Sequence, residues 1–289
     1  MQKTLLTIVA LTLTLFSFGQ RGKDGDLTVS SLNKVVNTYA KVTQSIPYNS
    51  TATIYVDDNK MNGADFAGDL GPGDLVLIYQ VQGVTADIDD WSVIGWGGKY
   101  VAQTSFFEEG GPSELIPNFI EFGNVVNYWA SGLYEYKEVK SVSGTNEITF
   151  TCNVSKYFYA GANDNCQVIR VPRYNSLTVP SGTSITATSW NGNTGGVVAV
   201  EVLNDLTVNG TGKIHADKKG FRGGATVNNG TMVAPGNNGS IASVGSRGYL
   251  GSYDPNEGAG KGESIFTNLD GWSARYGYGS LTNGGGGGG

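Results

Sequence analysis

The chain is poor in the residues that most often build catalytic sites. Among 289 residues there is one histidine, His215, and there are two cysteines. A Ser-His-Asp triad, a Cys-His pair and a histidine-rich metal site all require histidine at a defined place. Any such site in this chain therefore depends on the position of His215.

Long apolar runs are absent beyond the N-terminus. Residues 1–19 contain Lys3, the apolar stretch LLTIVALTLTLF and small residues before Gly19. This pattern is typical of a secretory signal peptide, and we expect cleavage after Gly19, which leaves Gln20 first. No later stretch approaches 18 consecutive apolar residues. The sequence therefore predicts no membrane span and a secreted or cell-surface location.

Basic clusters are also absent. Lysine and arginine number 19 against 25 acidic residues, and loss of Lys3 with the leader changes the net charge from −6 to −7. A mildly acidic chain without basic patches is not expected to bind nucleic acid or anionic membrane surfaces.

The two cysteines, Cys152 and Cys166, have no zinc-type spacing. In an exported chain two cysteines favour a structural disulfide, with two free thiols as the alternative. A loop of this size would contribute roughly 3 kcal/mol of entropic stabilisation.

Strand patterns dominate the first part of the chain. GDLVLIYQVQG (73–83) has apolar residues on both faces, as in a strand covered on two sides. In YEYKEVKSVSGTNEITFTCNV (134–154), a Ser-Gly-Thr-Asn turn predicts a hairpin. The alternation after this turn places four residues toward the core: Ile148, Phe150, Cys152 and Val154. Helical periodicity is arguable only in residues 26–42, where β-branched residues weaken it.

An internal repeat follows the hairpin. SLTVPSGTSITA (176–187) and DLTVNGTGKIHA (205–216) match at a period of 29 residues. The aligned pairs are Leu177 with Leu206, Val179 with Val208, Ile185 with Ile214, and Ala187 with Ala216. Short strands that recur at such a period predict stacked coils of a solenoid, each of which buries its apolar face on a neighbour.

The repeat register assigns His215 to the face opposite the aligned aliphatic residues. Thr186 fills the same position in the first copy, which favours an outward strand position for both. His215 is therefore expected to be a surface residue, and no catalytic or metal-binding set can be assembled around it.

Carboxylate chemistry needs only two acids and stays open on composition alone. Adjacent acids on a strand point to opposite faces, so acidic pairs are interpreted as solvated turns. The acidic groups are Asp57 with Asp58, Asp87 with Asp89 and Asp90, and Glu108 with Glu109.

No cofactor is expected, but one loop is rich in oxygen ligands. YVDDNKMNGADFAGD (55–69) could hold a structural calcium ion, although it lacks the EF-hand order of ligands. Its candidate ligands are Asp57, Asn59, Asn62, Asp65 and Asp69.

Aromatic residues gather among glycines in DDWSVIGWGGKY (89–100). Trp91, Trp96 and Tyr100 could stack on sugar rings, or they could anchor the loop in the core.

Glycine accounts for 44 residues, of which 21 fall within residues 220–289. The chain ends in GGGGGG, and a stop inside such a run is expected of the N-terminal part of a longer protein. Glycine permits both close backbone packing and mobility, so the order of this tract stays open.

Several of these segments occur in an order that resembles a known family. GDLVLIYQVQG, GLYEYKEVKSVSGTNEITF, CQVIRVPRYNSLTV, WNGNTGGVVAVEV and GFRGG precede the glycine-rich tract. In this order they are similar to the N-terminal region of large Bacteroidota-type surface adhesins, SprB-like gliding-motility proteins exported by type IX secretion. The resemblance implies a filamentous adhesin whose partners are an extracellular surface or polysaccharide and the outer-membrane secretion and motility machinery. It brings no catalytic residue.

The expected fold is all-β: a β-sandwich or barrel-like domain, then a parallel β-helix, then a glycine-rich tract. The expected boundaries are 1–19 for the signal peptide, 27–172 for the N-terminal domain, 173–220 for the start of the solenoid and 221–289 for the glycine-rich region. We expect a structural and display role in adhesion, with the N-terminal domain covering one end of the coils. The alternatives are a secreted polysaccharide-active β-helix enzyme and a non-catalytic carbohydrate-binding module.

Overall fold

The computed structural model describes residues 21–86, 125–127, 130–161, 164–222, 226–228, 231–233, 263 and 265–268. These residues contain strands and turns and no helix, which confirms the all-β prediction. Residues 26–42, the one arguable helix, form short strands instead. The predicted signal peptide lies outside the described residues, as does most of the glycine-rich tract.

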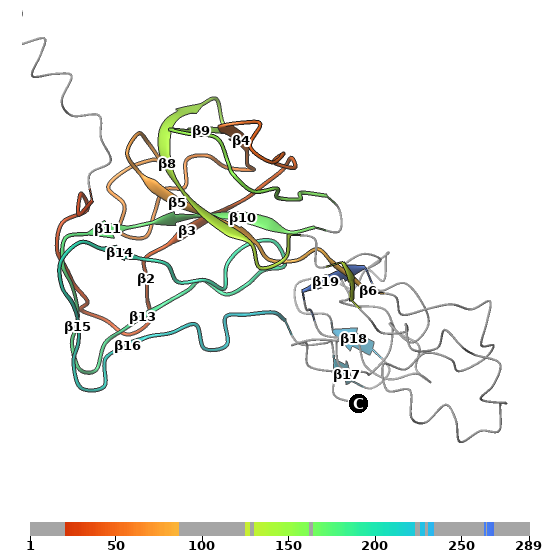
Figure 1. The fold of residues 1–289 in the computed structure, drawn as a ribbon. Coiled ribbons are helices and arrows are strands. Elements are labelled where there is room, and N and C mark those ends of the chain that lie inside the picture. The colour runs from red at the N-terminus through yellow and green to blue at the C-terminus, as the bar shows by residue number, and fades with distance from the viewer. Residues whose placement is uncertain are drawn as a thin grey trace, which may run out of the picture.

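The strands belong to two main bodies (Figure 1). The stacked coils contain β1 (Leu27–Thr28), β2 (Lys34–Val35), β11 (Arg173–Tyr174), β12 (Leu177–Val179), β13 (Ser184–Thr186), β14 (Glu201–Val202), β15 (Leu206–Val208) and β16 (Lys213–Ile214). A six-stranded sheet contains β3 (Thr38–Lys41), β4 (Thr53–Tyr55), β5 (Leu75–Gln80), β8 (Tyr134–Ser143), β9 (Glu147–Phe150) and β10 (Cys166–Val171). Five further short strands are β6 (Val84–Ala86), β7 (Val125–Asn127), β17 (Thr226–Asn228), β18 (Thr231–Val233) and β19 (Phe266–Asn268).

In the part of the chain that the structure describes, the stacked coils form a parallel β-helix of three rungs. β1, β12 and β15 pair in parallel along one side, β2, β13 and β16 along a second, and β11 and β14 along a third. Leu177 pairs with Leu206 and Ile185 with Ile214, so the predicted 29-residue register is confirmed. Inside the rungs, Leu177, Val179 and Ile185 are fully buried in one apolar cluster.

Polar side chains also stack from rung to rung. Asn204 Nδ2 donates to Asn175 Oδ1 over 2.7 Å, and Asn175 Nδ2 donates to Asp26 Oδ1 over 2.8 Å. At another turn the hydroxyls of Ser181 and Thr211 lie 3.0 Å apart. Asn175 and Asn204 hold equivalent positions of neighbouring rungs, whereas the other two bonds join positions that are one residue out of register. All three bonds tie the turns of neighbouring rungs together.

The β-helix begins earlier in the chain than its predicted start near residue 173. Residues 27–35 supply the first rung, since Leu27 pairs with Leu177 and Thr186 with Val35. The signal for this rung is present in the sequence, because DLTV occurs at 26–29 as well as at 205–208. The two copies stand far apart because the strands of the six-stranded sheet, from β3 to β10, are inserted between the first and second rungs.

The six-stranded sheet is antiparallel and closes on itself. Its strand order is β3-β10-β5-β8-β9-β4, and a bridge between Val42 and Val56 joins the last strand to the first. Thr43 N donates to Tyr55 O over 2.9 Å at this closure. Closure leaves no open edge at this point. The barrel-like form of the expected N-terminal domain is therefore the one observed.

One face of every strand lines the interior of the closed sheet. Ile78, Ile148 and Val168 are completely buried there. Val154 and Phe158, from the segment after β9, also join this core. The predicted hairpin is confirmed, with β8 and β9 joined at Ser143 and Glu147.

An extended segment attaches the closed sheet to the rungs. In GGVVAVEV (195–202), Val197 and Ala199 pack on the outer face of the sheet, against Leu77, Ile169 and Val171. Val198, Val200 and Val202 pack on the apolar cluster of the rungs. This alternation is the period of an extended chain. Both cores therefore share one segment, and the two bodies are fixed to each other.

Buried ion pairs reinforce this attachment. Arg173 donates to Glu201 over 2.5 Å and to Glu138 of β8 over 3.2 Å. Within the closed sheet itself, Arg170 of β10 donates to Asp74 over 2.7 Å and lies 3.9 Å from the centre of the Phe66 ring. Buried charges are tolerated when they are paired in this way.

Candidate functional site

The predicted aromatic site lies outside the described residues. Trp91, Trp96 and Tyr100 fall there, and so do the acidic groups at 87–90 and 108–109. The described surface nevertheless contains another aromatic group, which sequence analysis missed. We call it the tyrosine surface and define it by Tyr134, Tyr136, Lys156, Tyr157 and Tyr159.

Strand alternation turns the first two of these tyrosines outward. Tyr134 and Tyr136 belong to β8 and are 56% and 49% exposed, whereas the next residue of the strand, Lys137, is buried. Tyr157 and Tyr159 flank Phe158, which is fully buried in the interior of the closed sheet. Each Tyr-x-Tyr pair therefore places both rings on the side opposite the core.

The rings adopt two different arrangements. Tyr134 and Tyr136 are edge to face, with centroids 6.3 Å apart and an interplanar angle of 81°. Tyr157 and Tyr159 are tilted by 38°, with centroids 4.3 Å apart. Lys156, next to Tyr157 in the sequence, contacts the first pair: its ammonium lies 5.1 Å from the Tyr134 ring centre and donates to the backbone oxygen of Tyr134 over 2.7 Å. Such contacts restrict the rings before any ligand arrives.

Hydrogen bonds beneath the tyrosines fix the backbone. Gln80 receives a bond from Tyr159 N over 2.8 Å and donates to Tyr159 O over 3.0 Å. Burial raises the pKa of Tyr159, and the neighbouring Tyr157 and Asp164 raise it further. Burial and the adjacent Tyr134 raise the pKa of Tyr136 as well. Both of these phenols therefore stay neutral and can donate hydrogen bonds at physiological pH.

An ion pair supports the inward side of β8. Lys137 Nζ lies 2.6 Å from Glu135 Oε1 and donates to Asn153 O over 2.6 Å. Ser155 donates to the same carboxylate through its backbone and its hydroxyl. Burial alone would raise the pKa of Glu135, but the bonds from Lys137 and Ser155 outweigh burial and lower it. The carboxylate thereby holds residues 153–156 against β8.

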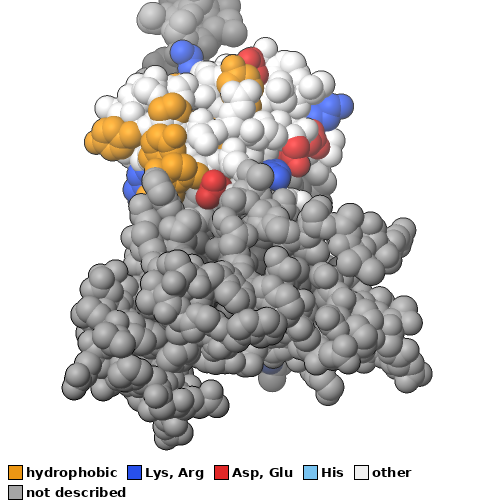
Figure 2. Space-filling model, turned by 90° about the vertical axis from the view of Figure 1, so that its right-hand side faces the viewer, with side chains coloured by type: hydrophobic (Ala, Val, Ile, Leu, Met, Phe, Trp, Pro, Cys, Tyr) orange, Lys and Arg blue, Asp and Glu red, His pale blue; other side chains and the backbone are white. Residues whose placement is uncertain are grey.

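The tyrosine surface has the chemistry of a stacking platform. Figure 2 shows hydrophobic side chains, a class that includes tyrosine, gathered in one part of the face that it draws. Phenol rings offer an apolar face to the C–H groups of a sugar ring, and their hydroxyls bond to its polar rim. Within the described ranges, no group of three His, Cys, Asp or Glu residues is placed to hold a metal ion.

The predicted disulfide is wrong: Cys152 and Cys166 are both free. β9 ends at Phe150, so the alternation that pointed Cys152 inward stops two residues before it. Cys152 is exposed, and its sulfur accepts a bond from Lys137 over 3.4 Å. Cys166 points into the interior of the closed sheet, where burial raises its pKa.

His215 directly follows β16; its Nδ1 is 3.2 Å from Asp217 Oδ2 and its side chain is 20% exposed. The inference drawn from Thr186 needs correction, because Thr186 is buried rather than outward and exposed. The alternation therefore placed Thr186 correctly on the side of the strand opposite Ile185. It did not predict that this side is covered.

The oxygen-rich loop at 55–69 uses its side chains as structural partners. Asn59 donates to Ser143 O and Glu147 O over 2.9 and 3.1 Å, at the β8–β9 turn. Asp65 lies 2.6 Å from Lys34 Nζ, and Asn62 donates to Asp69 over 2.8 Å. Asp57 accepts the backbone N–H of Lys41. These side chains face different partners and do not converge on one point.

Comparisons with known proteins give distant similarities only. No family model and no curated protein matches the chain. Among solved structures it is similar to the Gp54 tailspike of Acinetobacter baumannii bacteriophage AP22, in complex with A. baumannii capsular saccharide. The identity is 14% over 65% of this chain and 24% of that one, with a TM-score of 0.25. It is also similar to the Pseudomonas phage phi297 tailspike gp61, with 13% identity over 66% of this chain and 25% of that one, and a TM-score of 0.23.

A third similarity is to the tailspike gp49 of Pseudomonas phage LKA1, with 11% identity over 57% of this chain and 27% of that one, and a TM-score of 0.23. The chain thus spans about a quarter of the length of these tailspikes. A similarity this weak does not establish the fold. The β-helix is identified from the register of this chain's own strands. The part of the chain that the structure describes contains no helix long and apolar enough to span a membrane.

Proposed function

We propose that this chain is the structural and display region of a secreted cell-surface adhesin, and that its tyrosine surface binds polysaccharide. The observation that carries the proposal is the presentation of four tyrosines, in two contacting pairs, on a closed sheet fixed to a β-helix. A rigid support lowers the entropic cost of holding aromatic rings for a weak, repeated ligand.

The β-helix supports the structural half of the proposal. Its rungs are held by backbone ladders, by an apolar interior and by the column of Asp26, Asn175 and Asn204. Repeat stacking of this kind builds rods that place a binding surface away from the cell. The SprB-like family, export by type IX secretion and a part in gliding motility belong to the same proposal and are supported by the segment order in the sequence.

The acids at the junction of the two bodies have structural partners. Asp74 pairs with Arg170 and Lys23, and Glu138 and Glu201 pair with Arg173. Hydrolysis of a glycosidic bond needs two carboxyl groups that face one cleft, one of them free to carry a proton. Asp74, Glu138 and Glu201 are instead held in ion pairs.

Binding to immobilised polysaccharides tests the proposal. The mature chain is passed over a panel of neutral and acidic polysaccharides, and so is a Tyr134→Ala/Tyr136→Ala variant. Loss of two stacking rings is expected to weaken retention by roughly ten- to a hundredfold. Leu32→Ala is the matched control, because Leu32 is 67% exposed on the turn between β1 and β2.

The same experiment distinguishes the alternatives. Equal retention of wild type and the double variant contradicts a role for the tyrosine surface. Release of new reducing ends during incubation contradicts the binding role and favours a polysaccharide-active enzyme. Attachment of producing cells, measured with wild type and with the double variant, tests the adhesin role itself.

A further inference from the structure

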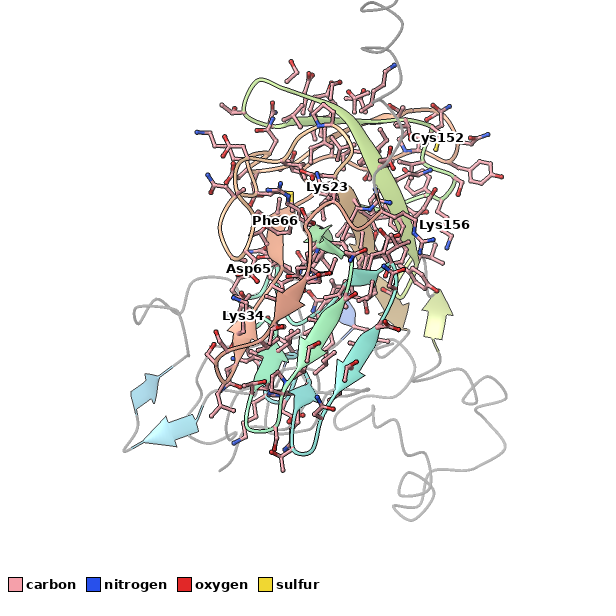
Figure 3. All side chains as sticks on the ribbon, turned by 90° about the vertical axis from the view of Figure 1, so that its left-hand side faces the viewer. Lys23, Lys34, Asp65, Phe66, Cys152 and Lys156 are labelled. Carbon is pink, nitrogen blue, oxygen red and sulfur yellow. The ribbon has the colours of Figure 1, made fainter. Side chains whose placement is uncertain are left out.

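The tyrosine surface contains a cation that has an aromatic neighbour and no acidic one. Lys156 Nζ donates to the backbone oxygen of Tyr134 and lies 5.1 Å from the centre of its ring. Figure 3 shows Lys156 beside the ribbon of β8. In the part of the chain that the structure describes, this ammonium forms no ion pair with a carboxylate. An ammonium has three N–H donors, so two of them can bond to a ligand.

The acids of β8 are already held by other cations. Glu135 lies 2.6 Å from Lys137, and Glu138 lies 3.2 Å from Arg173. Each of these carboxylates is therefore balanced by a positive charge at contact distance. Among the described side chains of this strand and its neighbours, Lys156 is the cation next to the exposed rings whose charge is left for a ligand.

The outer face of the closed sheet continues the aromatic surface beside this cation. Tyr134 is paired across the ladder with Tyr79 of β5, and Tyr136 is paired with Leu77. Paired residues of neighbouring strands point to the same face of a sheet. Ala199 packs on Leu77, whereas Tyr134 and Tyr136 are about half exposed. The extended segment thus covers part of this face and leaves the two tyrosines of β8 accessible.

The other pair of rings has a negative neighbour. The charge of Asp164 acts on Tyr159 and is one cause of the raised pKa of that phenol. An anionic ligand is repelled by Asp164 and attracted by Lys156. The electrostatics therefore favour Tyr134, and not Tyr159, as the place for a negatively charged group.

We propose that Tyr134, Tyr136 and Lys156 together bind an anionic polysaccharide, whose rings stack on the phenols and whose carboxylate or sulfate groups bond to the ammonium. Hydrogen bonds with a charged donor and a charged acceptor are about twice as strong as neutral ones. The whole chain has a net charge of −6, so the preference comes from contact with Lys156 and not from long-range attraction. This inference rests on the proposed function and adds the class of polysaccharide.

Two polymers that differ in charge alone test this preference. Polygalacturonate with free carboxylates and its methyl ester are immobilised, and retention of the mature chain is measured on each. We expect retention on the free acid to be stronger by about two- to fivefold at physiological salt. The difference should disappear at about 0.5 M salt, because salt screens exposed charges. Dextran sulfate beside plain dextran shows whether sulfate replaces carboxylate.

Variants of one lysine assign the preference to its charge. Lys156→Gln should reduce retention on the anionic polymers to the level of the neutral ones, and Lys156→Arg should preserve the difference. Lys140→Gln is the matched control, because Lys140 is an exposed residue of the same strand, about 20 Å from Tyr134 along it. This control changes the net charge equally and is expected to leave retention unchanged.

The outcomes separate this inference from the proposed function. Equal retention on charged and neutral polymers, lost in the Tyr134→Ala/Tyr136→Ala variant, preserves the binding role and overturns the inference. Equal losses from Lys156→Gln and Lys140→Gln also overturn it, since net charge then explains the preference. No retention on any of the four polymers overturns the proposed function and this inference with it.

Discussion

The side-chain amide of Gln167 bonds twice to the backbone of Gly195. Gln167 Nε2 donates to Gly195 O over 3.1 Å, and Gly195 N donates to Gln167 Oε1 over 2.8 Å. Gln167 belongs to the closed sheet, and Gly195 opens the segment shared with the rungs. Asn37 binds the backbone of Ala199 in the same way, with bonds of 2.7 and 3.0 Å. Two buried amides thus imitate strand pairing at a junction where no regular strand forms.

Replacement of Gly195 by alanine should weaken this junction. Gly195 has a φ of 106°, and an added Cβ would stand 2.6 Å from Ser189 O. We expect Gly195→Ala to lower the free energy of unfolding by about 2–4 kcal/mol in denaturant titrations. Gly182→Ala is the control, because Gly182 has a φ of 82° with nothing within 4 Å of the added Cβ. Equal losses of stability at both positions would show that the steric clash contributes nothing.

The two cysteines should differ in accessibility. Cys152 is exposed, and Cys166 is buried with a raised pKa. A thiol reagent is expected to modify Cys152 in the native protein and Cys166 only after unfolding, because the thiolate is the reactive form. Mass spectrometry of alkylated peptides measures both. Recovery of a linked Cys152–Cys166 peptide would restore the disulfide that the sequence suggested.

Glu135 should make stability depend on acid pH. Its pKa is lowered in the folded protein by the bonds from Lys137 and Ser155, which outweigh burial. The stabilisation is therefore present above the ordinary glutamate pKa of about 4.3 and is lost as pH falls through the lower folded value. Thermal unfolding of wild type and Glu135→Gln is measured between neutral and acid pH. The difference in Tm between the two proteins should narrow below about pH 4. A gap that is constant over this range contradicts the role of the charged carboxylate.

Tyr39 should make stability depend on alkaline pH, so that stability is lost as the pH rises rather than as it falls. Burial raises its pKa to about 12, although a backbone hydrogen bond at Thr188 acts against the increase. Its neutral phenol donates to Val197 O over 2.6 Å. This stabilisation is complete below the ordinary tyrosine pKa of about 10 and is lost as pH rises through about 12.

Absorbance of the ionised phenol measures this titration. The difference between wild type and Tyr39→Phe isolates one residue among the 15 tyrosines. The difference is expected to appear near pH 12, together with a loss of stability above about pH 10 that Tyr39→Phe does not share. A difference that titrates with the exposed tyrosines would place Tyr39 in solvent.

The sequence predicted the rung register because the second and third rungs are consecutive. Leu177 and Leu206 stand one coil apart, so the repeat is visible over a short window. The first rung repeats the same DLTV motif, but the inserted sheet separates it from its neighbour by 150 positions. Periodicity detects contacts between adjacent repeats, and an insertion of this length removes the period while leaving the packing unchanged.

The errors at Cys152 and Thr186 have a common physical origin. Alternation tells which side of an extended strand a residue faces, but it holds only while the strand continues. β9 ends before Cys152, and the side that Thr186 faces is covered by packing that its own neighbours do not encode. The tyrosine surface could have been found from its two Tyr-x-Tyr pairs, because the middle residue of each pair lies on the inward side.

The insertion of the closed sheet determines the order in which the molecule can assemble. Residues 26–29 are synthesised before the sheet, yet the strand that completes them lies 150 residues later. Until Leu177 is synthesised, the first rung has no second rung to cover it. The strands of the closed sheet, by contrast, can already pair with one another. Contacts over such distances form slowly. Residues 26–29 are therefore among the last to pack, although they are synthesised early. During folding this segment needs protection until the second rung covers it.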